Sequence, residues 1–384
     1  MPGGGVALTF GGYLHIPFCS TRCDYCAFAT WTDRGHLVDR YLAGLATEVD
    51  RAVADGLPAL TSVFVGGGTP SLVPADGLVD VLRRLPLAPD AEVTIEANPD
   101  SVTAESLRTY RAGGVNRMSF GVQSMRPHVL AALGRTHDPD NVRQAVAWTR
   151  EAGFETFNLD LIMGAAGETV DDWASSIDDV LALDPPHISA YGLTVEPGTP
   201  LAADPDRHPD DDDQADKYLL TDERLATAGL RWYEVSNWAR PGHECRHNRL
   251  YWDAGDYLGF GCAAHSHRGG RRWWNLRTPE RYLDAVETGA STEAAGEDLD
   301  DATRRLEALQ LALRTRDGVP AAALDLDDPA LVDLVVRQGD RVVLTPEGRL
   351  LANEVAVRLR TDVVVSVGSA RQAGGPGSGG TSST

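Results

Sequence analysis

Short apolar runs of β type alternate with longer amphipathic stretches through the first 200 residues, after a brief lead-in over residues 1–10. The predicted strands are Gly12–Ile16, Ser62–Val65, Glu92–Glu96, Arg117–Val122, Thr156–Met163 and His187–Leu193. The predicted helices are Leu37–Ala54, Pro74–Leu85, Thr103–Ala112, Asp140–Ala152 and Val170–Leu183. Thr103 with Ser106 signals a helix start, and Gly113, Gly153 and Pro185 signal helix ends. The alternation predicts right-handed βαβ units and an α/β fold, a partial (β/α)6 barrel.

Polar residues gather where the predicted strands end. A cysteine-rich loop follows the first strand, and Gly66-Gly67-Gly68-Thr69-Pro70 follows the second. Glu96-Ala-Asn98, Gly121-Val-Gln123 and Asn158-Leu-Asp160 lie at or near the ends of the next three. Parallel β/α folds place their chemistry at the carboxyl ends of the strands, so these residues predict one shared site.

The cysteine-rich loop reads Cys19-Ser-Thr-Arg-Cys23-Asp-Tyr-Cys26 and holds three of the five cysteines in the chain. Such crowding favours a metal or redox role over core packing, which requires no such spacing. Three thiolates on a four-iron cluster would leave one iron open, as catalytic metal sites do for a substrate. We interpret the loop as an open iron–sulfur cluster site. A zinc site completed by His15 and a set of free thiols are the alternatives.

The composition limits the classes of binding partner and the cellular compartment that we expect for this protein. Apolar residues make up 42% of the chain, and no run of about 18 apolar residues predicts a membrane span. The formal net charge of −21 disfavours nucleic acids and anionic lipids, which need a basic surface. Few cysteines and the lack of a secretion signal predict a cytoplasmic protein. The acidic run Asp210–Asp213 is expected to be a solvated loop.

Beyond about residue 200 the strand–helix rhythm ends. We expect a helix near Gln214–Ala228, a strand over Trp232–Trp238, and a helix from Asp298 toward Arg314. A small α+β unit, resembling a winged helix, is expected from Ala330–Gln338, Arg341–Leu344 and Glu347–Leu359. The predicted division is a barrel over residues 1–200, a barrel extension over 201–295, a small C-terminal domain over 296–367 and a Gly/Ser-rich disordered tail over 368–384.

The run Tyr-Leu-His-Ile-Pro-Phe-Cys19-x3-Cys23-x2-Cys26 resembles the cluster loop of radical S-adenosylmethionine (SAM) enzymes, in particular the oxygen-independent coproporphyrinogen oxidase group. The resemblance implies a 4Fe–4S cluster held by Cys19, Cys23 and Cys26, whose free iron chelates SAM. It also implies a set of SAM-contacting residues: Tyr13, Gly67, Gly68, Thr69, Glu96, Gln123, Arg135 and Asp160. One departure is Gly164-Ala165-Ala166-Gly167, where relatives usually read Gly-Leu-Pro; it implies a change in loop packing.

A second departure separates two groups within this family. Coproporphyrinogen dehydrogenases carry a fourth Cys two positions after the third, where this chain has Phe28. The motif His247-Asn248-x-x-Tyr251-Trp252 instead matches relatives that act as heme chaperones, the HemW type. The resemblance therefore implies heme as a cofactor, transfer of heme to a respiratory acceptor at the membrane face, and no integral membrane segment. An oxygen-independent coproporphyrinogen III dehydrogenase is the alternative, and a radical SAM enzyme with another substrate is a third.

The motif residues also have a physical reason to meet heme. Histidine is a common axial ligand of haem iron, and aromatic neighbours can stack on the porphyrin face. A histidine hydrogen-bonded inside an aromatic-rich core is the other interpretation of His247. Cys245 is a second possible ligand, and for His265 and His267 core packing is the favoured interpretation.

Overall fold

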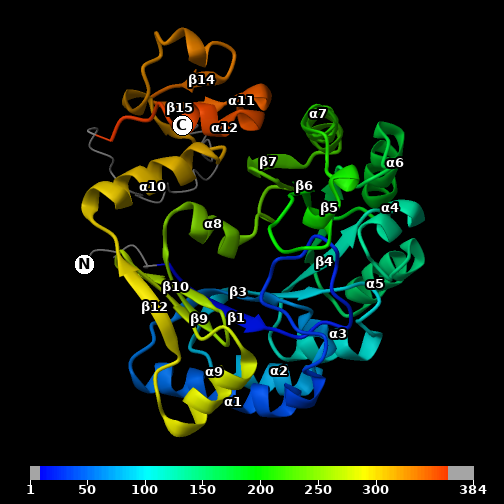
Figure 1. The fold of residues 1–384 in the computed structure, drawn as a ribbon, viewed down its shortest axis with the longest axis vertical. Helices are drawn as coiled ribbons and strands as arrows, with labels where there is room; N and C mark the ends of the chain where they lie inside the picture. The colour runs from blue at the N-terminus through cyan, green and yellow to red at the C-terminus, as the bar shows by residue number, and fades with distance from the viewer. Residues whose placement is uncertain (1–8, 362–384) are drawn as a thin grey trace, which may run out of the picture.

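In the computed structural model, whose described part is residues 9–361, twelve strands form one curved sheet in the order β12-β11-β10-β9-β1-β2-β3-β4-β5-β6-β8-β7. Strands β1 to β6 run parallel, as predicted. Helices α1 to α6 lie around the outside of this part of the sheet (Figure 1). The α/β class and the partial barrel are therefore confirmed. The predicted disordered tail lies outside the described residues.

The barrel strands follow the predicted runs closely. Their bounds are β1 Phe10–Ile16, β2 Leu60–Gly67, β3 Leu87–Ala97, β4 Arg117–Gln123, β5 Thr156–Met163 and β6 His187–Gly192. Both faces of these strands are largely buried, which explains their nearly continuous apolar character.

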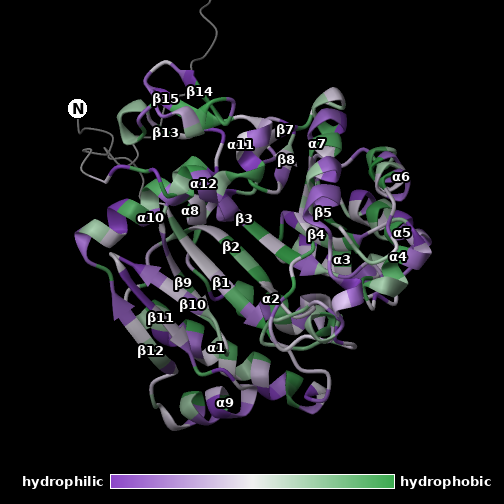
Figure 2. Ribbon diagram, turned by 45° about the horizontal axis from the view of Figure 1, so that its top comes forward, coloured by the Kyte–Doolittle hydropathy of each residue, from purple (hydrophilic) through white to green (hydrophobic). Residues whose placement is uncertain are grey.

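The helices that pack on the barrel have the bounds α1 Val38–Ala54, α2 Ala75–Leu82, α3 Ala104–Ala112, α4 Pro127–Ala132, α5 Pro139–Glu151, α6 Val170–Leu181 and α7 Asp211–Thr227. In α1 the buried residues Tyr41, Leu45 and Val49 recur every four positions and form one apolar face. The same two-sided character shows in Figure 2, where hydrophobic and hydrophilic residues alternate along these helices. The Thr103–Ser106 pair forms the predicted capping box of α3.

The acidic run at Asp210–Asp213 is not a loop, so that prediction was wrong. Asp210 caps α7 by accepting a hydrogen bond from the Asp213 backbone, and the other acids occupy the first turn. Negative charge there is stabilised by the helix dipole, which explains why an acidic cluster begins a helix.

The barrel extension adds strands to both edges of the parallel sheet. Its elements are β7 Arg231–Glu234, β8 Asn237–Ala239, α8 Arg246–Trp252, β9 Asp256–Phe260, β10 His265–Arg268, β11 Arg271–Asn275, α9 Pro279–Thr288 and β12 Glu293–Asp298. The single strand predicted over Trp232–Trp238 was wrong: a turn between Glu234 and Asn237 folds it into a hairpin. Strand β9 pairs in parallel with β1, and α8 packs against β1 and β2.

The C-terminal unit has a core of its own, which includes Leu309, Leu313 and Val342. It contains α10 Asp301–Leu313, β13 Val319–Pro320, β14 Val335–Gln338, β15 Arg341–Leu344, α11 Pro346–Leu350 and α12 Ala352–Ala356, with the strands in the order β13-β15-β14. Its α+β composition was predicted. Arg349 joins it to the barrel, because its guanidinium pairs with Asp222 at 2.8 Å and lies 3.7 Å from the Trp232 ring centroid.

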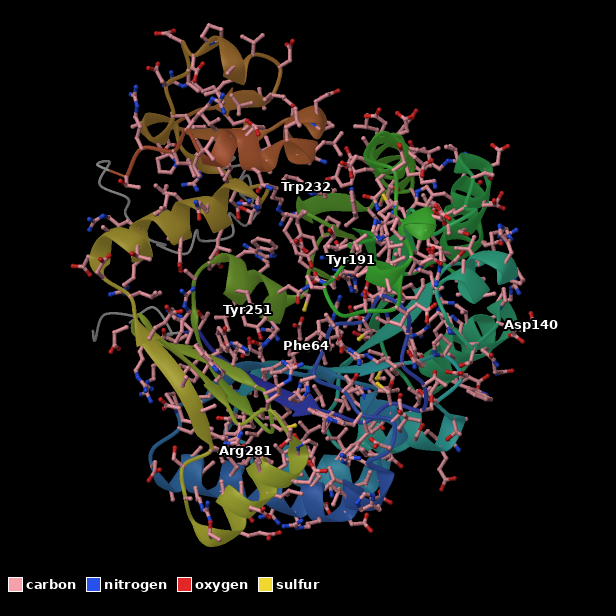
Figure 3. The ribbon with its side chains drawn as sticks, in the orientation of Figure 1. Phe64, Asp140, Tyr191, Trp232, Tyr251 and Arg281 are labelled. Atoms are coloured by element: carbon pink, nitrogen blue, oxygen red, sulfur yellow. The ribbon has the colours of Figure 1, made fainter. Side chains whose placement is uncertain are left out.

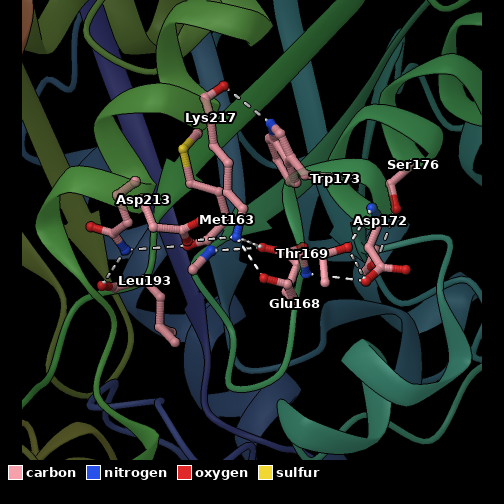
Figure 4. A network of polar contacts seen from close by, with 12 residues as sticks. Met163, Glu168, Thr169, Asp172, Trp173, Ser176, Leu193, Asp213 and Lys217 are labelled. Atoms are coloured by element: carbon pink, nitrogen blue, oxygen red, sulfur yellow. Dashed lines mark hydrogen bonds and ion pairs between the residues drawn. The ribbon is translucent and has the colours of Figure 1, made fainter.

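A buried ion pair holds the loop between β5 and α6, the loop where the sequence departs from Gly-Leu-Pro. The Lys217 ammonium lies 3.2 Å from Glu168 Oε2, and both side chains are fully buried (Figure 4). Glu168 Oε2 also accepts the Gly164 backbone N–H at 2.8 Å, and Lys217 donates to Asp213 at 2.6 Å. The pair therefore fixes this loop against α7.

In the described part of the chain no helix has the length and apolar character needed to cross a membrane.

Replacing Lys217 with Met should lower the free energy of unfolding by about 3–5 kcal/mol, because it leaves the Glu168 carboxylate buried without a cation. The matched control is Arg224→Met, which removes an exposed ion pair with Asp178 and should cost less than about 1 kcal/mol. Denaturant titration followed by tryptophan fluorescence measures both, and equal losses in the two variants would contradict the assigned role of Lys217.

Candidate cofactor site

A cleft of about 620 Å³ opens at the carboxyl ends of the barrel strands. The predicted site residues that line it come from the loops and ends of β1 to β5: Cys19, Cys23, Cys26, Gly67, Gly68, Thr69, Glu96, Gln123, Arg135 and Asp160. The topology thus brings together ten residues that span more than 140 positions of the chain, counted from Cys19 to Asp160. The volume lies within the range of small-molecule and cofactor sites, about 300–1,000 Å³.

The cysteine loop lies against the other walls of this cleft. Cys19, Cys23 and Cys26 are half-buried, unpaired thiols. Thr69 Oγ1 lies 3.7 Å from Cys19 Sγ, and Arg135 Nη1 donates to Cys23 Sγ at 3.4 Å. Burial raises the pKa of Cys19, and the Thr69 hydroxyl opposes that rise. A cationic donor and a hydroxyl beside the sulfurs suit thiolate ligands.

These three thiols fit the predicted iron–sulfur cluster. Thiolates are the usual protein ligands of such clusters, and all three face one cleft. Within residues 9–361 no three ligating side chains converge on one point as a single metal ion would require. A cluster distributes its ligands over several irons and makes no such demand.

His15 does not complete a zinc site with the cysteines. Its Nε2 lies 2.9 Å from the Ala29 carbonyl oxygen and must donate to it, so Nδ1 accepts a hydrogen bond from the Tyr13 hydroxyl at 3.1 Å. Burial lowers the pKa of His15 to about 4, which keeps the ring neutral. Both nitrogens are therefore used, and His15 anchors the far side of the cysteine loop. Tyr13, a predicted SAM contact, lies behind the cleft wall in this arrangement.

The glycine turn after β2 packs directly under the cysteine loop. Gly68 N donates to Ile16 O at 2.7 Å, and a Cβ atom on Gly68 would lie 2.6 Å from the Phe18 oxygen. Gly67 has φ 110°, and a Cβ there would lie 2.4 Å from the His15 ring. Because glycine has no Cβ atom, these two residues allow the cysteine loop to lie this close to the turn.

Two carboxylates form the floor of the cleft. Glu96 Oε2 accepts the Gly67 backbone N–H at 3.2 Å, and Asp160 accepts hydrogen bonds from Asn158 at 2.7 Å and Ser119 at 3.2 Å. Burial, followed by the nearby charge of Asp160, raises the pKa of Glu96 to about 8. Two buried acids that face each other suit a ligand that carries positive charge or hydroxyl donors.

Gln123 and Arg135 supply polar groups on the opposite wall. Gln123 adopts φ 64°, and its buried Oε1 has no hydrogen-bond partner among the described residues. An unpaired acceptor in a left-handed residue indicates a position held for a ligand. Arg135 donates to Asn98 Oδ1 at 2.5 Å and to Gly121 O at 2.9 Å. Asn98, which the sequence placed at the end of the third strand, also lines the cleft, although it was not among the predicted SAM contacts.

The predicted heme motif lies elsewhere, on α8, toward the amino ends of β1 and β2. His247 is fully buried: Ser62 Oγ lies 3.0 Å from its Nδ1, and the Tyr251 hydroxyl lies 2.9 Å from its Nε2. Its ring stacks on Phe64, with 5.5 Å between centroids. Figure 3 labels Phe64 on β2 and Tyr251 on α8, the two aromatic neighbours of this ring. Burial lowers the pKa of His247 to about 3. The hydrogen bonds with Ser62 and Tyr251 thus occupy both ring nitrogens of His247 in this conformation.

The other motif residues surround His247 in different ways. Asn248 and Cys245 line an inner polar cavity of about 190 Å³ that also reaches Glu96 and Asp160. Tyr251 and Trp252 are half-buried, and Tyr251 packs edge-on against Tyr257 at 4.7 Å between centroids. The motif helix thus closes the barrel beneath the cleft.

Of the remaining ligand candidates, only one faces solvent. Cys245 is buried, and its Sγ donates to Glu92 at 3.4 Å. His267 donates from Nδ1 to Gly255 O at 2.9 Å. His265 is exposed, stacks on Trp274 at 5.6 Å, and makes no hydrogen bond within the described part of the chain. Core packing, the interpretation favoured for both histidines, does not hold for His265.

Comparison with known proteins supports the same chemistry. The model of the radical SAM superfamily matches residues 13–180. The heme chaperone HemW of Mycobacterium tuberculosis (strain ATCC 25618 / H37Rv) is 45% identical over 365 residues, which cover 90% of this chain and 93% of that protein. HemW of Bacillus subtilis (strain 168) is 35% identical over 367 residues, covering 89% of this chain and 97% of that protein. The solved coproporphyrinogen III oxidase HemN of Escherichia coli, a radical SAM enzyme, superposes with a TM-score of 0.80 over 91% of this chain and 89% of its own, and at 24% identity it establishes the fold.

Replacing Cys23 with Ala should prevent full cluster assembly, because only three thiolates line the cleft and two are too few to hold the cluster. Anaerobic reconstitution should then give substoichiometric iron and sulfide. Cys245→Ala, which removes a thiol outside the loop, is the matched control and should assemble a full cluster. A full cluster in Cys23→Ala would remove the loop from the cluster site.

The raised pKa of Glu96 makes stability depend on pH in the ligand-free protein. The folded protein keeps this proton up to about pH 8, whereas the unfolded chain releases it near the ordinary pKa of 4.5. The stability contributed by the neutral acid is therefore fully present below pH 4.5 and lost as the pH rises to 8. Glu96→Gln stays neutral, so it should be more stable than wild type by at least about 1 kcal/mol at pH 8.5 and nearly equal at pH 5. Denaturation at both pH values tests this, with the exposed Glu105→Gln as control; a constant difference would contradict it.

Proposed function

This chain belongs to the HemW family of radical SAM proteins, and from that premise we propose that it is a heme chaperone, which binds heme and transfers it to acceptor hemoproteins. The observation that carries the proposal is the 45% identity to a heme chaperone across 93% of that protein's length. The motif His247-Asn248-x-x-Tyr251-Trp252 and the presence of Phe28 in place of a fourth cysteine support the same assignment.

Membership of this superfamily gives the chain a 4Fe–4S cluster and SAM as cofactors. In our proposal Cys19, Cys23 and Cys26 would hold the cluster, which would supply an open iron for the amino and carboxylate groups of SAM. Glu96 and Asp160 would accept hydrogen bonds from the hydroxyl or amino groups of SAM, and Arg135 would donate hydrogen bonds to its carboxylate. The unpaired Gln123 oxygen at the cleft wall supports a donor group of SAM beside it.

Heme is proposed to bind at the α8 motif, with His247 as the axial ligand. In the closed arrangement both His247 nitrogens are hydrogen-bonded, so ligation requires α8 to release Tyr251 or Ser62. Each of these bonds contributes about 1 kcal/mol, so breaking one of them is a modest cost. Heme capture is therefore coupled to a local opening at the amino ends of β1 and β2.

The alternative function, oxidative decarboxylation of coproporphyrinogen III, receives less support. Phe28 exposes 67% of its surface at the edge of the cleft, where the fourth cysteine of those enzymes would lie. An aromatic side chain there provides no thiolate and instead presents an apolar surface beside the cluster loop.

The acceptor and the compartment are parts of the same proposal. Unpaired cysteines that hold an oxygen-sensitive cluster suit a reducing cytoplasm. A respiratory hemoprotein at the membrane face is the proposed acceptor, as the family resemblance implies. Nucleic acid is not a proposed partner, given the net charge of −21.

A paired assay tests the function. Purified protein should bind heme, and anaerobic turnover with SAM and coproporphyrinogen III should yield no protoporphyrinogen. In the same titrations His247→Ala should lose or shift the Soret band but retain cluster content and SAM binding, because distant sites act almost independently. Tyr251→Phe keeps the imidazole and frees its Nε2, so it should strengthen heme binding by about fivefold to tenfold.

His265→Ala is the control for this assay, because it removes an exposed histidine outside the motif. An unchanged Soret band in His247→Ala, with a shifted band in His265→Ala, would place the axial ligand on β10. Formation of protoporphyrinogen would overturn the chaperone assignment itself.

A further inference from the structure

A chain of buried hydrogen bonds ends on the Asp160 carboxylate. Asn158 Nδ2 lies 2.7 Å from Asp160 Oδ1, and the Asn158 oxygen lies 2.5 Å from His187 Nδ1. His187 Nε2 lies 2.8 Å from the Tyr233 hydroxyl, which accepts the Cys245 backbone N–H at 3.3 Å. All five residues are buried or lie on the cleft floor. This chain of hydrogen bonds thus starts at Cys245, the residue that precedes α8, and ends at Asp160 in the cofactor cleft.

The direction of every bond in this chain follows from its last member. An ionised carboxylate can only accept, so the amide nitrogen of Asn158 must face Asp160. The Asn158 oxygen then accepts from His187, which places the single imidazole proton on Nδ1. His187 Nε2 consequently accepts the proton of the Tyr233 hydroxyl.

Two serines on neighbouring strands prevent the amide from turning. Ser189 donates to Asn237 Oδ1 at 2.7 Å, so its oxygen accepts from Asn158 at 2.9 Å. Ser119 donates to Asp160 Oδ2 at 3.2 Å, so its oxygen is a further acceptor 2.9 Å from the Asn158 amide nitrogen. The two amide hydrogens are shared among the three acceptors Asp160, Ser189 and Ser119. A flipped Asn158 would aim its oxygen at three acceptors, and His187 would then face an N–H with its own N–H.

We propose that His187 is a positioning residue for the SAM site: with Tyr233 it fixes the Asn158 amide so that Asp160 stays ionised in one orientation toward the cleft. This inference rests on the proposed role of Asp160 in SAM binding. His187 itself touches neither the cleft nor the cysteine loop, and lies at the amino end of β6. It therefore acts through Asn158.

The charges around Asp160 make this positioning necessary. Burial raises the pKa of Asp160, while the Asn158 and Ser119 side chains and the charge of Arg117 oppose the rise. Glu96 faces Asp160 from β3, Arg117 from β4 and Tyr191 from β6. Burial, together with Arg117 and His243, lowers the pKa of His187 far below its ordinary value. A neutral imidazole with one proton is the state that the direction of the chain requires.

Histidine ¹⁵N NMR on the wild-type protein tests the direction without any substitution. His187 should show the Nδ1–H tautomer and should not titrate around pH 6.5, the ordinary pKa of histidine, because burial lowers its pKa well below that value. The Nε2–H tautomer at His187 would reverse the chain and overturn the proposal.

Three variants of the cluster-loaded protein test the consequence by titration with SAM from pH 6 to 8.5. His187→Leu removes the donor to Asn158 and should weaken SAM binding at least about tenfold at pH 7, with a smaller loss as the pH rises and more of the Asp160 carboxyl is ionised. His187→Asn keeps a nitrogen donor at the same distance from Cβ and should stay within about threefold of wild type. Glu96 titrates in the wild type and in both His187 variants, so the difference in SAM affinity between each variant and the wild type reports on Asp160.

The third variant, Asp160→Asn, separates this inference from the function beneath it. SAM binding at wild-type strength in Asp160→Asn would remove Asp160 from the SAM site, whatever tautomer His187 shows. SAM binding that weakens in Asp160→Asn but matches wild type at every pH in His187→Leu would overturn the positioning role alone. Weak binding in both His187 variants at every pH would also overturn it, because a general packing defect would explain the loss.

Discussion

The candidate site depends on the contact between the cysteine loop and the glycine turn after β2. Backbone hydrogen bonds from Gly68 and Thr69 to the first strand and its loop hold the two segments so close that a Cβ atom on Gly68 would lie 2.6 Å from a backbone oxygen. This approach places Thr69 beside Cys19 and His15 beneath Gly67. Because the contact is between backbones, its geometry leaves little freedom for the thiols it positions.

The interior of the barrel is polar where many β/α barrels are filled with apolar side chains. Glu96, Asp160 and Arg117 lie around one inner cavity of about 190 Å³, and the Asn158–His187 pair connects them to the barrel extension. Buried charges are costly unless hydrogen-bonded, and nearly every polar atom here has a defined donor or acceptor. A ligand with positive charge above Glu96 and Asp160 would complete this balance. The buried carboxylates that suit such a ligand therefore also lower the stability of the folded protein on its own.

The motif helix α8 and the cleft are two sides of one cavity. Asn248 and Cys245 reach the cavity from below, whereas Glu96 and Asp160 reach it from the cleft. His247, on the same helix, is sealed by Ser62 and Tyr251. His247 itself lines neither this cavity nor the cleft, which separates the proposed heme ligand from the predicted SAM contacts.

The sequence alone determined the barrel strands, the cysteine loop and the polar residues at the strand ends, because these depend on local periodicity and spacing along the chain. Cys19, Glu96 and Asp160 could be placed at one edge since parallel strands bring their carboxyl ends together. Only the tertiary structure decided that His15 anchors a loop, that His247 is sealed, and that His187 reaches Asp160 through Asn158. Those roles depend on hydrogen-bond partners between 14 and 185 positions away in the sequence, and no local pattern encodes such pairings. The parallel pairing of β9 with β1 was invisible for the same reason.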